Sequence, residues 1–340
     1  MINKKANIKD VAEQAGVSVT TVSMVLSEKG RISSETIDKV NQAVQELGYI
    51  KNRSASNLRS QKSALIGLIL RDISDPYYAE VTAGLSEVLE DKGYMLFLAQ
   101  SGTNQDKFDQ CIATMVAQGV GGIVFCPIRD IGVPNIDKVK ELNVPIVCVA
   151  RAKVGQQIDF VGPDNMQAAK IATEYLIKQG HRQIAYVGGQ SDSLSRAERL
   201  GGYCSTLMQF GLPFKPEWVI ECDKSQTASA EAVNQLINKN PKITALLCHY
   251  SSTAFGAVYG VNRSNRSVGK DNYIGQQVAI IGFDDVPEAE LIQPSLTFVS
   301  TPVRDIGREA GHRLISQLES KDSVPQSVIL SPELIARDSA

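Results

Sequence analysis

The sequence lacks the long apolar segments that are typical of membrane proteins and exported proteins. In 340 residues, apolar runs such as residues 64–70 fall far short of the roughly 20 residues that a membrane-spanning helix needs. Basic residues near the N-terminus have no apolar segment behind them, so we expect no signal peptide and no membrane partner. The sequence therefore predicts a cytoplasmic protein.

The sequence also lacks the usual motifs of enzymes and metal sites. It contains no complete glycine-rich dinucleotide or phosphate loop and no G-x-S-x-G nucleophile elbow. Its three histidines are far apart in the chain, and its six cysteines include no C-x-x-C pair. We therefore expect reduced thiols, no catalytic residues, no metal and no cofactor.

Charge is distributed unevenly along the chain. Residues 1–62 contain ten Lys or Arg against six Asp or Glu, whereas the remaining residues contain 25 against 31. A small basic head on a mildly acidic body indicates that only the head meets a polyanion. On its own, a surplus of this size is also typical of a solvated surface.

The head has the apolar spacing of three short helices. The first helix is expected to end at Gly16, the second to follow after a very short turn, and the third to begin at Ser33 or Ser34. The expected apolar stripe of the third helix consists of Ile37, Val40, Ala43, Val44 and Leu47.

The stretch "SVTTVSMVLS", residues 18–27, divides into two faces when it is placed on a helix. Val22, Val25 and Leu26 form the face expected to join the small core. The opposite face carries hydroxyls and apolar tips but no charge pairs, and it consists of Val19, Thr20, Ser23, Met24 and Ser27. A helix, a short turn and a second helix with such a face predict a helix-turn-helix. A small packing module without DNA contacts is the alternative.

The stretch "NRSASNLRS", residues 52–60, has Leu58 as its one large apolar residue. One interpretation is that Leu58 anchors the segment on the adjacent domain. The other is an apolar wedge in the minor groove of DNA, with Arg53 and Arg59 on phosphates. The residues leave both interpretations open.

From residue 64 onward, apolar strands alternate with amphipathic helices, which predicts parallel sheets covered on both faces. Eight to ten such units favour two doubly wound lobes, which bind ligands at the carboxyl ends of their strands. Ser195, Arg196 and Arg199 lie at the start of a helix, and Asp164 and Asp284 follow strands. These side chains suit a hydroxyl-rich ligand, whereas the alternative is that they are surface charges or helix caps.

The order of segments in "IKDVAEQAGVSVTTVSMVLSEKGRISSETIDKVNQAVQELGYIKNRSASNLRS" resembles the lactose–galactose repressor (LacI/GalR) family. The resemblance continues through "DISDPYYAEVTAGL", "DNMQAA", "RAERLGGY" and "IGFDDV", so it covers nearly the whole chain. It implies a DNA-binding repressor of carbohydrate-related genes that binds a pseudo-palindromic operator as a homodimer. A small-molecule effector, a sugar or sugar derivative, would control it.

The resemblance also implies roles for particular residues. Val19 and Thr20 match the main base-contacting pair of the family, and the other residues implied to contact DNA are Ser18, Thr21, Ser23, Met24, Ser27, Arg31, Ser33, Thr36, Asn52, Arg53, Ala55, Leu58 and Arg59. The residues implied to contact the effector are Tyr77, Tyr78, Asp164, Ser193, Ser195, Arg196, Arg199 and Asp284. Two departures are Met24, where many relatives carry Arg, and Tyr250–Ser251, where many carry Asn-Asp.

The resemblance implies a body like that of periplasmic sugar-binding proteins. We expect a helix-turn-helix head at 1–50, a hinge at 51–62 and an effector-binding and dimerisation body at 63–340. Within the body, lobe 1 is expected at about 63–162 and 291–323, and lobe 2 at about 163–290 and 324–340. The alternative function is that of a sugar-binding protein without a transcriptional role.

Overall fold

The computed structural model describes residues 6–27, 30–49, 63–127, 144–150, 158–271, 276–319 and 324–340. The chain divides into two compact units, Met1–Ser63 and Ala64–Ala340. The predicted hinge at 51–62 lies outside the described residues. Within the described ranges, no helix is both long enough and apolar enough to cross a membrane.

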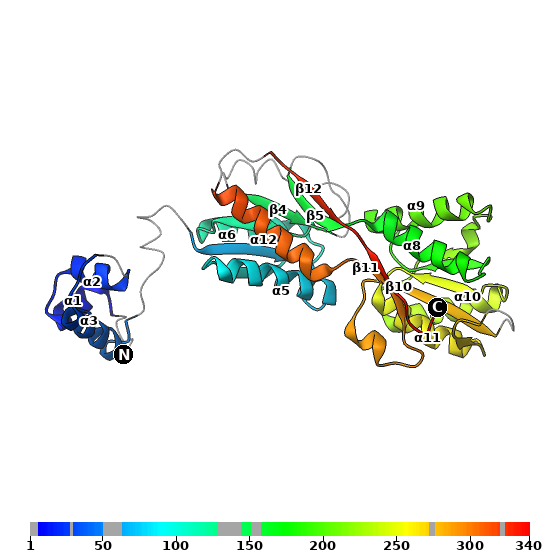
Figure 1. Cartoon of the computed structure of the whole chain (residues 1–340), viewed down its shortest axis with the longest axis horizontal. Helices are drawn as coiled ribbons and strands as arrows, with labels where there is room; N and C mark the ends of the chain where they lie inside the picture. The colour runs from blue at the N-terminus through cyan, green and yellow to red at the C-terminus, as the bar shows by residue number, and fades with distance from the viewer. Residues whose placement is uncertain are drawn as a thin grey trace. The chain divides into compact units, whose positions relative to one another are not determined.

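The first unit is built from three helices (Figure 1), which are α1 (Ile8–Ala15), α2 (Val19–Leu26) and α3 (Ser34–Glu46). Gly16 ends α1 in the left-handed conformation, with a φ of 64°, which explains why glycine stands there. Ser18 caps α2 and Ser33 caps α3, each by accepting a hydrogen bond from a backbone amide three residues later. The predicted helices and caps are therefore confirmed.

A small apolar cluster holds the three helices together. Its fully buried residues come from each helix, with Val11 from α1, Val22 from α2 and Val40 from α3. Val44 and Leu47 pack against this cluster as predicted, but the prediction for Ile37 is wrong because its side chain is 37% exposed. Ile37 lies in the first turn of α3, so the apolar stripe extends one turn beyond the core that it covers.

The second unit contains two lobes, each with its own sheet. In the first lobe six parallel strands have the order β12-β5-β4-β3-β1-β2. Its strands are β1 (Leu65–Leu70), β2 (Met95–Gln100), β3 (Gly122–Phe125), β4 (Ile146–Val149), β5 (Asp159–Pro163) and β12 (Ser327–Leu330). Its helices are α5 (Pro76–Asp91), α6 (Gln105–Ala117) and α12 (Val303–Glu319).

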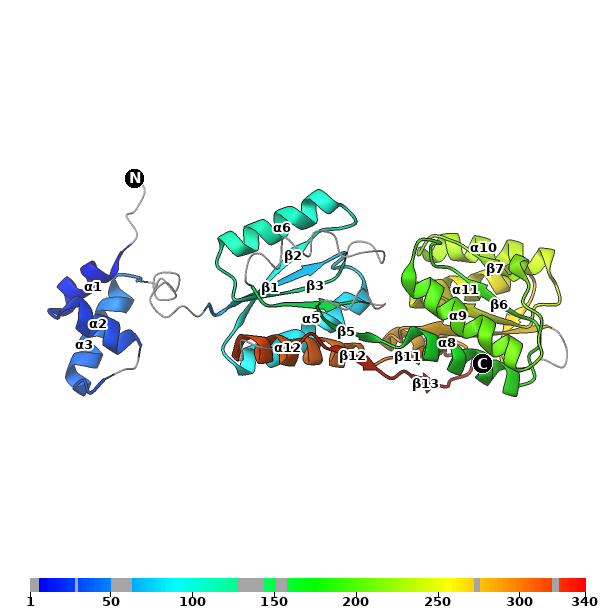
Figure 2. The ribbon, with the colours of Figure 1, turned by 90° about the horizontal axis from the view of Figure 1, so that it is seen from above.

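The central strands of the first lobe, β1, β3, β4 and β5, are buried on both faces of the sheet. Helix α6 covers one face, and α5 and α12 lie together on the other (Figure 2). Because side chains alternate along a strand, Leu68 and Leu70 of β1 join the cluster under α5 and α12, whereas Ile69 joins the cluster under α6. Burial on both faces explains why the strands are apolar throughout.

The second lobe has a similar sheet with the strand order β13-β11-β10-β8-β6-β7, in which β13 is antiparallel to β11 and β9 pairs with β10 outside this order. Its strands are β6 (Ile184–Val187), β7 (Val219–Ile220), β8 (Ala245–Cys248), β9 (Ser267–Val268), β10 (Gln277–Phe283), β11 (Thr297–Ser300) and β13 (Glu333–Ile335). Its helices are α8 (Asn165–Lys178), α9 (Leu194–Gln209), α10 (Gln226–Lys239) and α11 (Ser251–Arg263), with short 3₁₀ turns at Pro216–Trp218 and Pro287–Glu290. Helices α8 and α9 cover one face, and α10 and α11 cover the other (Figure 1).

The chain passes between the two lobes after β5, after β11 and after β12. Two of the predicted lobe boundaries, near residues 290 and 323, are wrong because β11 belongs to the second lobe and β12 to the first. Val299 of β11 pairs with Leu334, whereas Ile329 of β12 pairs with Gly162 of β5. Both strands are four residues long, and such a short pattern does not determine which sheet a strand joins.

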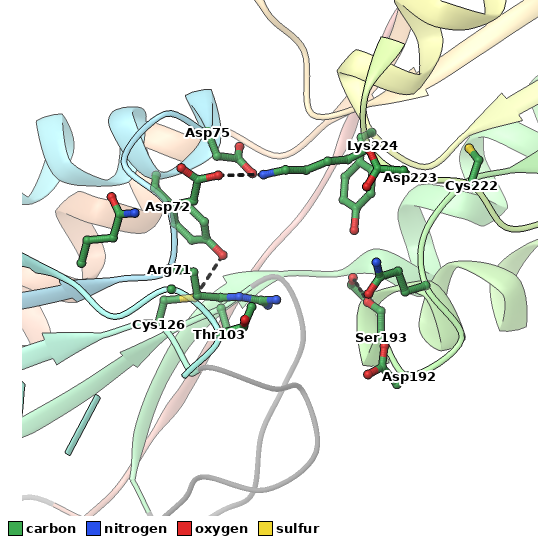
Figure 3. A pocket seen from close by; sticks show the side chains of 17 residues that line it. Arg71, Asp72, Asp75, Thr103, Cys126, Asp192, Ser193, Cys222, Asp223 and Lys224 are labelled. Atoms are coloured by element: carbon green, nitrogen blue, oxygen red, sulfur yellow. Dashed lines mark hydrogen bonds and ion pairs between the residues drawn. The ribbon is translucent and has the colours of Figure 1, made fainter. Parts of the chain in front are cut away.

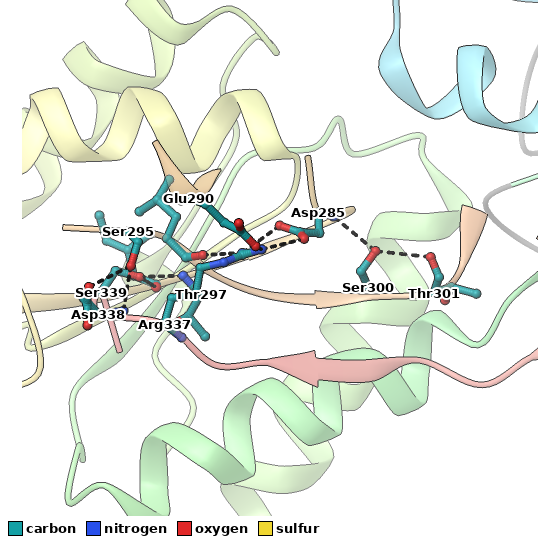
Figure 4. A network of polar contacts seen from close by, with 11 residues as sticks. Asp285, Glu290, Ser295, Thr297, Ser300, Thr301, Arg337, Asp338 and Ser339 are labelled. Carbon is teal, nitrogen blue, oxygen red and sulfur yellow. Dashed lines mark hydrogen bonds and ion pairs between the residues drawn. The ribbon is translucent and has the colours of Figure 1, made fainter. Parts of the chain in front are cut away.

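The C-terminal segment is fixed to the second lobe by a polar network (Figure 4). The guanidinium of Arg337 donates to both carboxylate oxygens of Asp285, at 2.8 Å each, and to Glu290 at 3.1 Å. Ser339 is buried, and its hydroxyl donates to the carbonyl of Ile280 at 2.7 Å. The last residues of the chain are therefore part of this lobe's core.

A buried histidine gives the second lobe a pH dependence that can be measured. Burial, with the charge of Arg182 as a smaller cause, lowers the pKa of His181 from 6.5 to about 4. Between these values the unfolded chain binds a proton that the folded chain does not, so stability is complete above about pH 6.5 and falls toward about pH 4.

Asparagine does not titrate, so we expect His181→Asn to lose less stability than the unsubstituted protein when the pH falls from 7 to 4. The difference in the free energy of unfolding should be up to about 3 kcal/mol. Urea unfolding followed by the fluorescence of Trp218, the single tryptophan, measures this in the second lobe. A pH profile that is identical in the variant and the unsubstituted protein would contradict the expectation.

Candidate functional site

The outward face of α2 is as predicted. Val19 and Met24 have exposed fractions of 40% and 43%, and Thr20 is also exposed, whereas Val22 on the other side is fully buried. Ser23 is half-buried, and Val25 and Leu26 pack against the core. Helix α2 therefore exposes the side chains of Val19, Thr20 and Met24 to solvent, while its opposite face packs against the core of the first unit.

Several of the predicted DNA-contacting hydroxyls already bond within the helices. Ser18 Oγ accepts from the amide of Thr21 and lies 2.8 Å from its hydroxyl, and Ser33 and Thr36 form the same pair at 2.9 Å. The hydroxyl of Ser27 donates to the carbonyl of Ser23. Ser18 and Ser33 thus fix the starts of α2 and α3, and Ser27 lies at the end of α2. A hydroxyl can both donate and accept, so these side chains retain capacity for a further partner.

Arg31 is exposed in the turn between α2 and α3. The other predicted DNA-contacting residues, Asn52, Arg53, Ala55, Leu58 and Arg59, lie outside the described residues.

In the second unit a cavity of about 650 Å³ lies between the two lobes (Figure 3). Its first-lobe residues are Arg71, Asp72, Asp75, Tyr78, Gln100, Gly102, Thr103, Cys126 and Ala150. Its second-lobe residues are Gln190, Asp192, Ser193, Ser195, Cys222, Asp223, Lys224 and Tyr250. Most of these residues directly follow a strand, so the cavity lies at the carboxyl ends of both parallel sheets, where a ligand is expected.

The predicted effector-contacting residues separate into two groups. Tyr78, Ser193 and Ser195 line this cavity, and Asp284 lines a neighbouring cavity of about 600 Å³. The remaining four line neither cavity, and they are Tyr77, Asp164, Arg196 and Arg199. Asp164 caps α8 by accepting from the amide of Gln167 at 2.9 Å, which is the alternative role considered for it.

Arg199 is the centre of a buried polar network behind the cavity wall. Its side chain is 2% exposed, and it donates to Asn165 Oδ1 at 2.9 Å, to the carbonyl of His249 and to Asp284 Oδ1 at 3.1 Å. The guanidinium also lies 4.4 Å from the ring centre of Phe283. Asp284 has a φ of 65°, a strained conformation outside glycine that is retained where the surroundings fix it. Arg199 therefore joins α8, α9 and the ends of β8 and β10.

The aromatic side chains of the cavity are held by buried neighbours. The thiol of Cys126 lies 3.3 Å from the hydroxyl of Tyr78. Tyr250 contacts the ring of His249 edge-on at 4.3 Å, and His249 Nδ1 lies 2.6 Å from the hydroxyl of Tyr186. Rings fixed in this way offer apolar faces within an otherwise polar cavity.

Asp72 and Lys224 form an ion pair across the cavity, with Nζ 2.8 Å from Oδ2 (Figure 3). The hydrogen bond from Lys224, followed by that from Ser74, lowers the pKa of Asp72 from 3.8 to about 2. Sequence reasoning did not select either residue, because an isolated charge after a strand looks like a solvated side chain. Their position after β1 and β7, at the carboxyl edges, was the available signal.

Comparisons with known proteins agree with this arrangement. Residues 63–338 match the periplasmic binding proteins and sugar binding domain of the LacI family, and residues 7–52 match the bacterial regulatory proteins of the lacI family. The chain belongs to the LacI family.

Among the relatives of this LacI-family protein is the maltose regulon regulatory protein MalI of Escherichia coli K12, 44% identical with 98% of each chain covered. Catabolite control protein A of Priestia megaterium is 32% identical, with 96% and 97% covered. The sequence also predicted a particular likeness to the maltose-regulon repressor, from "SVTTVSMVLS" with "RISSETIDKVN" and from residues 188–214. That likeness is confirmed.

Solved structures give the same result. The Lac repressor dimer bound to operator and an anti-inducer has a TM-score of 0.86, with 26% identity and 99% of each chain covered. The regulator CelR in complex with cellobiose has a TM-score of 0.74, with 27% identity and coverage of 98% and 100%. Because the match to MalI covers nearly the whole chain and residues 7–52 match the lacI-family regulatory proteins, the alternative of a sugar-binding protein without a transcriptional role is not supported.

The network around Arg199 predicts a large stability effect in this LacI-family protein. We expect Arg199→Met to lower the free energy of unfolding by about 3–5 kcal/mol, because it removes the buried hydrogen bonds that the guanidinium donates to Asn165, His249 and Asp284. Arg263→Gln is a suitable control, since its contact with Glu231 is exposed and 4.0 Å long, and it should change stability by less than about 0.5 kcal/mol. Urea unfolding of both variants measures the difference, and equal effects would contradict a structural role for Arg199.

Proposed function

We propose that this protein represses carbohydrate-related genes by binding a pseudo-palindromic operator as a homodimer. We further propose that a sugar or sugar derivative binds in the 650 Å³ cavity and controls this activity. The observation that carries the second proposal is the cavity itself, which lies at the carboxyl ends of both sheets and is lined by polar side chains from both lobes. The names of two relatives, a maltose regulon protein and a cellobiose complex, support the ligand class.

In the head, the exposed face of α2 is proposed to enter the major groove. Val19 and Met24 offer apolar contact to thymine methyl groups, and the hydroxyls of Thr20 and Ser23 offer hydrogen bonds to base edges. The capped starts of α2 and α3, with Ser18, Thr21, Ser33 and Thr36, would bind backbone phosphates together with Arg31 and with Ser27 at the end of α2. The proposed hinge contacts are Asn52, Arg53, Ala55, Leu58 and Arg59.

In the cavity, the ligand is proposed to be rich in hydroxyl groups. Ser193 and Ser195, whose hydroxyls lie 2.9 Å apart, and the carboxylate of Asp192 can pair with such groups, and the rings of Tyr78 and Tyr250 can cover the apolar face of a sugar ring. The other residues implied to contact the effector do not line this cavity, and we propose that they support its walls. They are Tyr77, Asp164, Arg196, Arg199 and Asp284. Binding would shift the angle between the lobes, and a coupling of about 1–3 kcal/mol is sufficient for a useful switch.

Met24 provides a test of the DNA-binding surface. We expect Met24→Arg to change the preferred base at one position of each half-site toward G·C, with a discrimination of about 1–3 kcal/mol, because arginine donates two hydrogen bonds to guanine. Selection of operators from a randomised DNA library, with the unsubstituted protein and the variant, measures the change. Gln45→Arg adds the same charge on exposed α3 and should leave the base preference unchanged. An unaltered preference in Met24→Arg would show that Met24 does not face the bases.

Tyr250 provides a test of the effector cavity. Calorimetry with maltose, cellobiose and glucose 6-phosphate is expected to detect binding of at least one saccharide. We expect Tyr250→Ala to weaken that binding about tenfold, because the ring face is removed. Tyr259→Ala lies in α11, the helix that follows Tyr250, but it is exposed and outside both cavities, so it should bind as the unsubstituted protein does. Equal losses in both variants, or no binding of any probe, would contradict the proposed ligand site.

A further inference from the structure

The pair of Asp72 and Lys224 connects the two lobes of the body. Asp72 follows β1 of the first lobe, and Lys224 precedes α10 of the second (Figure 3). Among the ion pairs between described residues, it is the only one that joins the lobes. A movement of one lobe relative to the other therefore acts directly on this contact.

Each partner is held by its own lobe. Asp72 Oδ1 accepts from the amide of Ser74 at 3.1 Å and from its hydroxyl at 2.6 Å, which leaves Oδ2 for Lys224. Lys224 lies between Asp223, which accepts from the amide of Ser225, and Ser225 itself, which caps α10. Each charge thus lies on a turn that is hydrogen-bonded within its own lobe, so the ion pair joins two separately fixed segments.

The ion pair also lies where the two cavities meet. Four residues line both the 650 Å³ cavity and the 600 Å³ cavity, and they are Asp75, Asp223, Lys224 and Tyr250. These four residues form the wall between the two cavities, and Lys224 is the member of the wall that pairs with the opposite lobe. Opening of the pair would remove part of this wall.

We propose that Asp72 and Lys224 form an ionic latch that holds the lobes together in the absence of ligand and separates the interlobe space into two cavities. The latch is weak because solvent screens the two charges, whose side chains are 33% exposed for Asp72 and 56% exposed for Lys224. Pairs with this exposure shift an equilibrium by about two- to fivefold and are screened by salt. The latch thus makes the position of the lobes sensitive to ionic strength.

Hydrogen exchange of the full-length, ligand-free protein tests the latch across the interface. We expect Lys224→Gln to accelerate exchange about two- to fivefold in the first-lobe segment 71–78, and Asp72→Asn to do the same in the second-lobe segment 222–228. The double variant should exchange no faster than either single variant, because the interaction is already absent. Lys224→Arg keeps the charge and should restore slow exchange.

Salt and a matched variant complete the experiment. Raising NaCl from about 0.1 M to about 1 M shortens the screening length from about 10 Å to about 3 Å, so it should accelerate exchange in the unsubstituted protein but not in Lys224→Gln. Lys178→Gln breaks an ion pair with Glu174 of 2.7 Å within α8 and should leave both segments unchanged.

Three results would overturn the proposal. The first is acceleration confined to the substituted lobe, which would indicate a local turn rather than a latch. The second is equal acceleration in Lys178→Gln, and the third is faster exchange throughout the chain, which would indicate a loss of folding stability.

Discussion

A guanidinium that is removed from water must have every partner in place, and Arg199 imposes this constraint on the second lobe. Its partners lie on α8 and at the ends of β8 and β10. One of them, Asp284, lines a cavity, and the cavity-lining Tyr250 directly follows another partner, His249. Asp284, whose backbone has a φ of 65°, accepts a hydrogen bond from this guanidinium, which helps to fix its conformation. The buried network thus lies directly behind the residues that line the cavities, and the positions of those residues depend on the network.

Much of the fold could be predicted from periodicity. Strands buried on both faces are apolar throughout, helices show one apolar stripe, and α2 is short enough that its two faces are unambiguous. The assignment of β11 and β12 to sheets could not be predicted, because a four-residue apolar pattern does not say which strand is its partner. Strand β11 pairs with β10 and β13 of the second lobe, whereas β12 pairs with β5, more than 160 residues away. Ile37 could not be predicted for a related reason. The apolar stripe of α3 shows which face is buried, but not how far along the helix the apolar cluster of the head extends.

The candidate site was predictable in place and partly in content. The carboxyl edges of the strands follow from parallel topology, and Tyr78, Ser193 and Ser195 lie where the sequence indicated. Asp72 and Lys224 are 152 residues apart, and each resembles a solvated charge until the two lobes are placed together. By contrast, Asp164 and Arg199 carry the polar chemistry expected of ligand contacts, yet they serve a helix cap and a buried network in this structure.

Strand β1 has a further mechanical meaning. Its first residue, Leu65, follows the segment that leads from the head, and its last residue, Leu70, is two positions before Asp72 in the cleft. The strand is paired on both sides, with β2 and β3, so it cannot bend independently of the sheet. Six extended residues span roughly 20 Å. The same strand therefore has one end at the cleft and the other at the point where the chain enters the body.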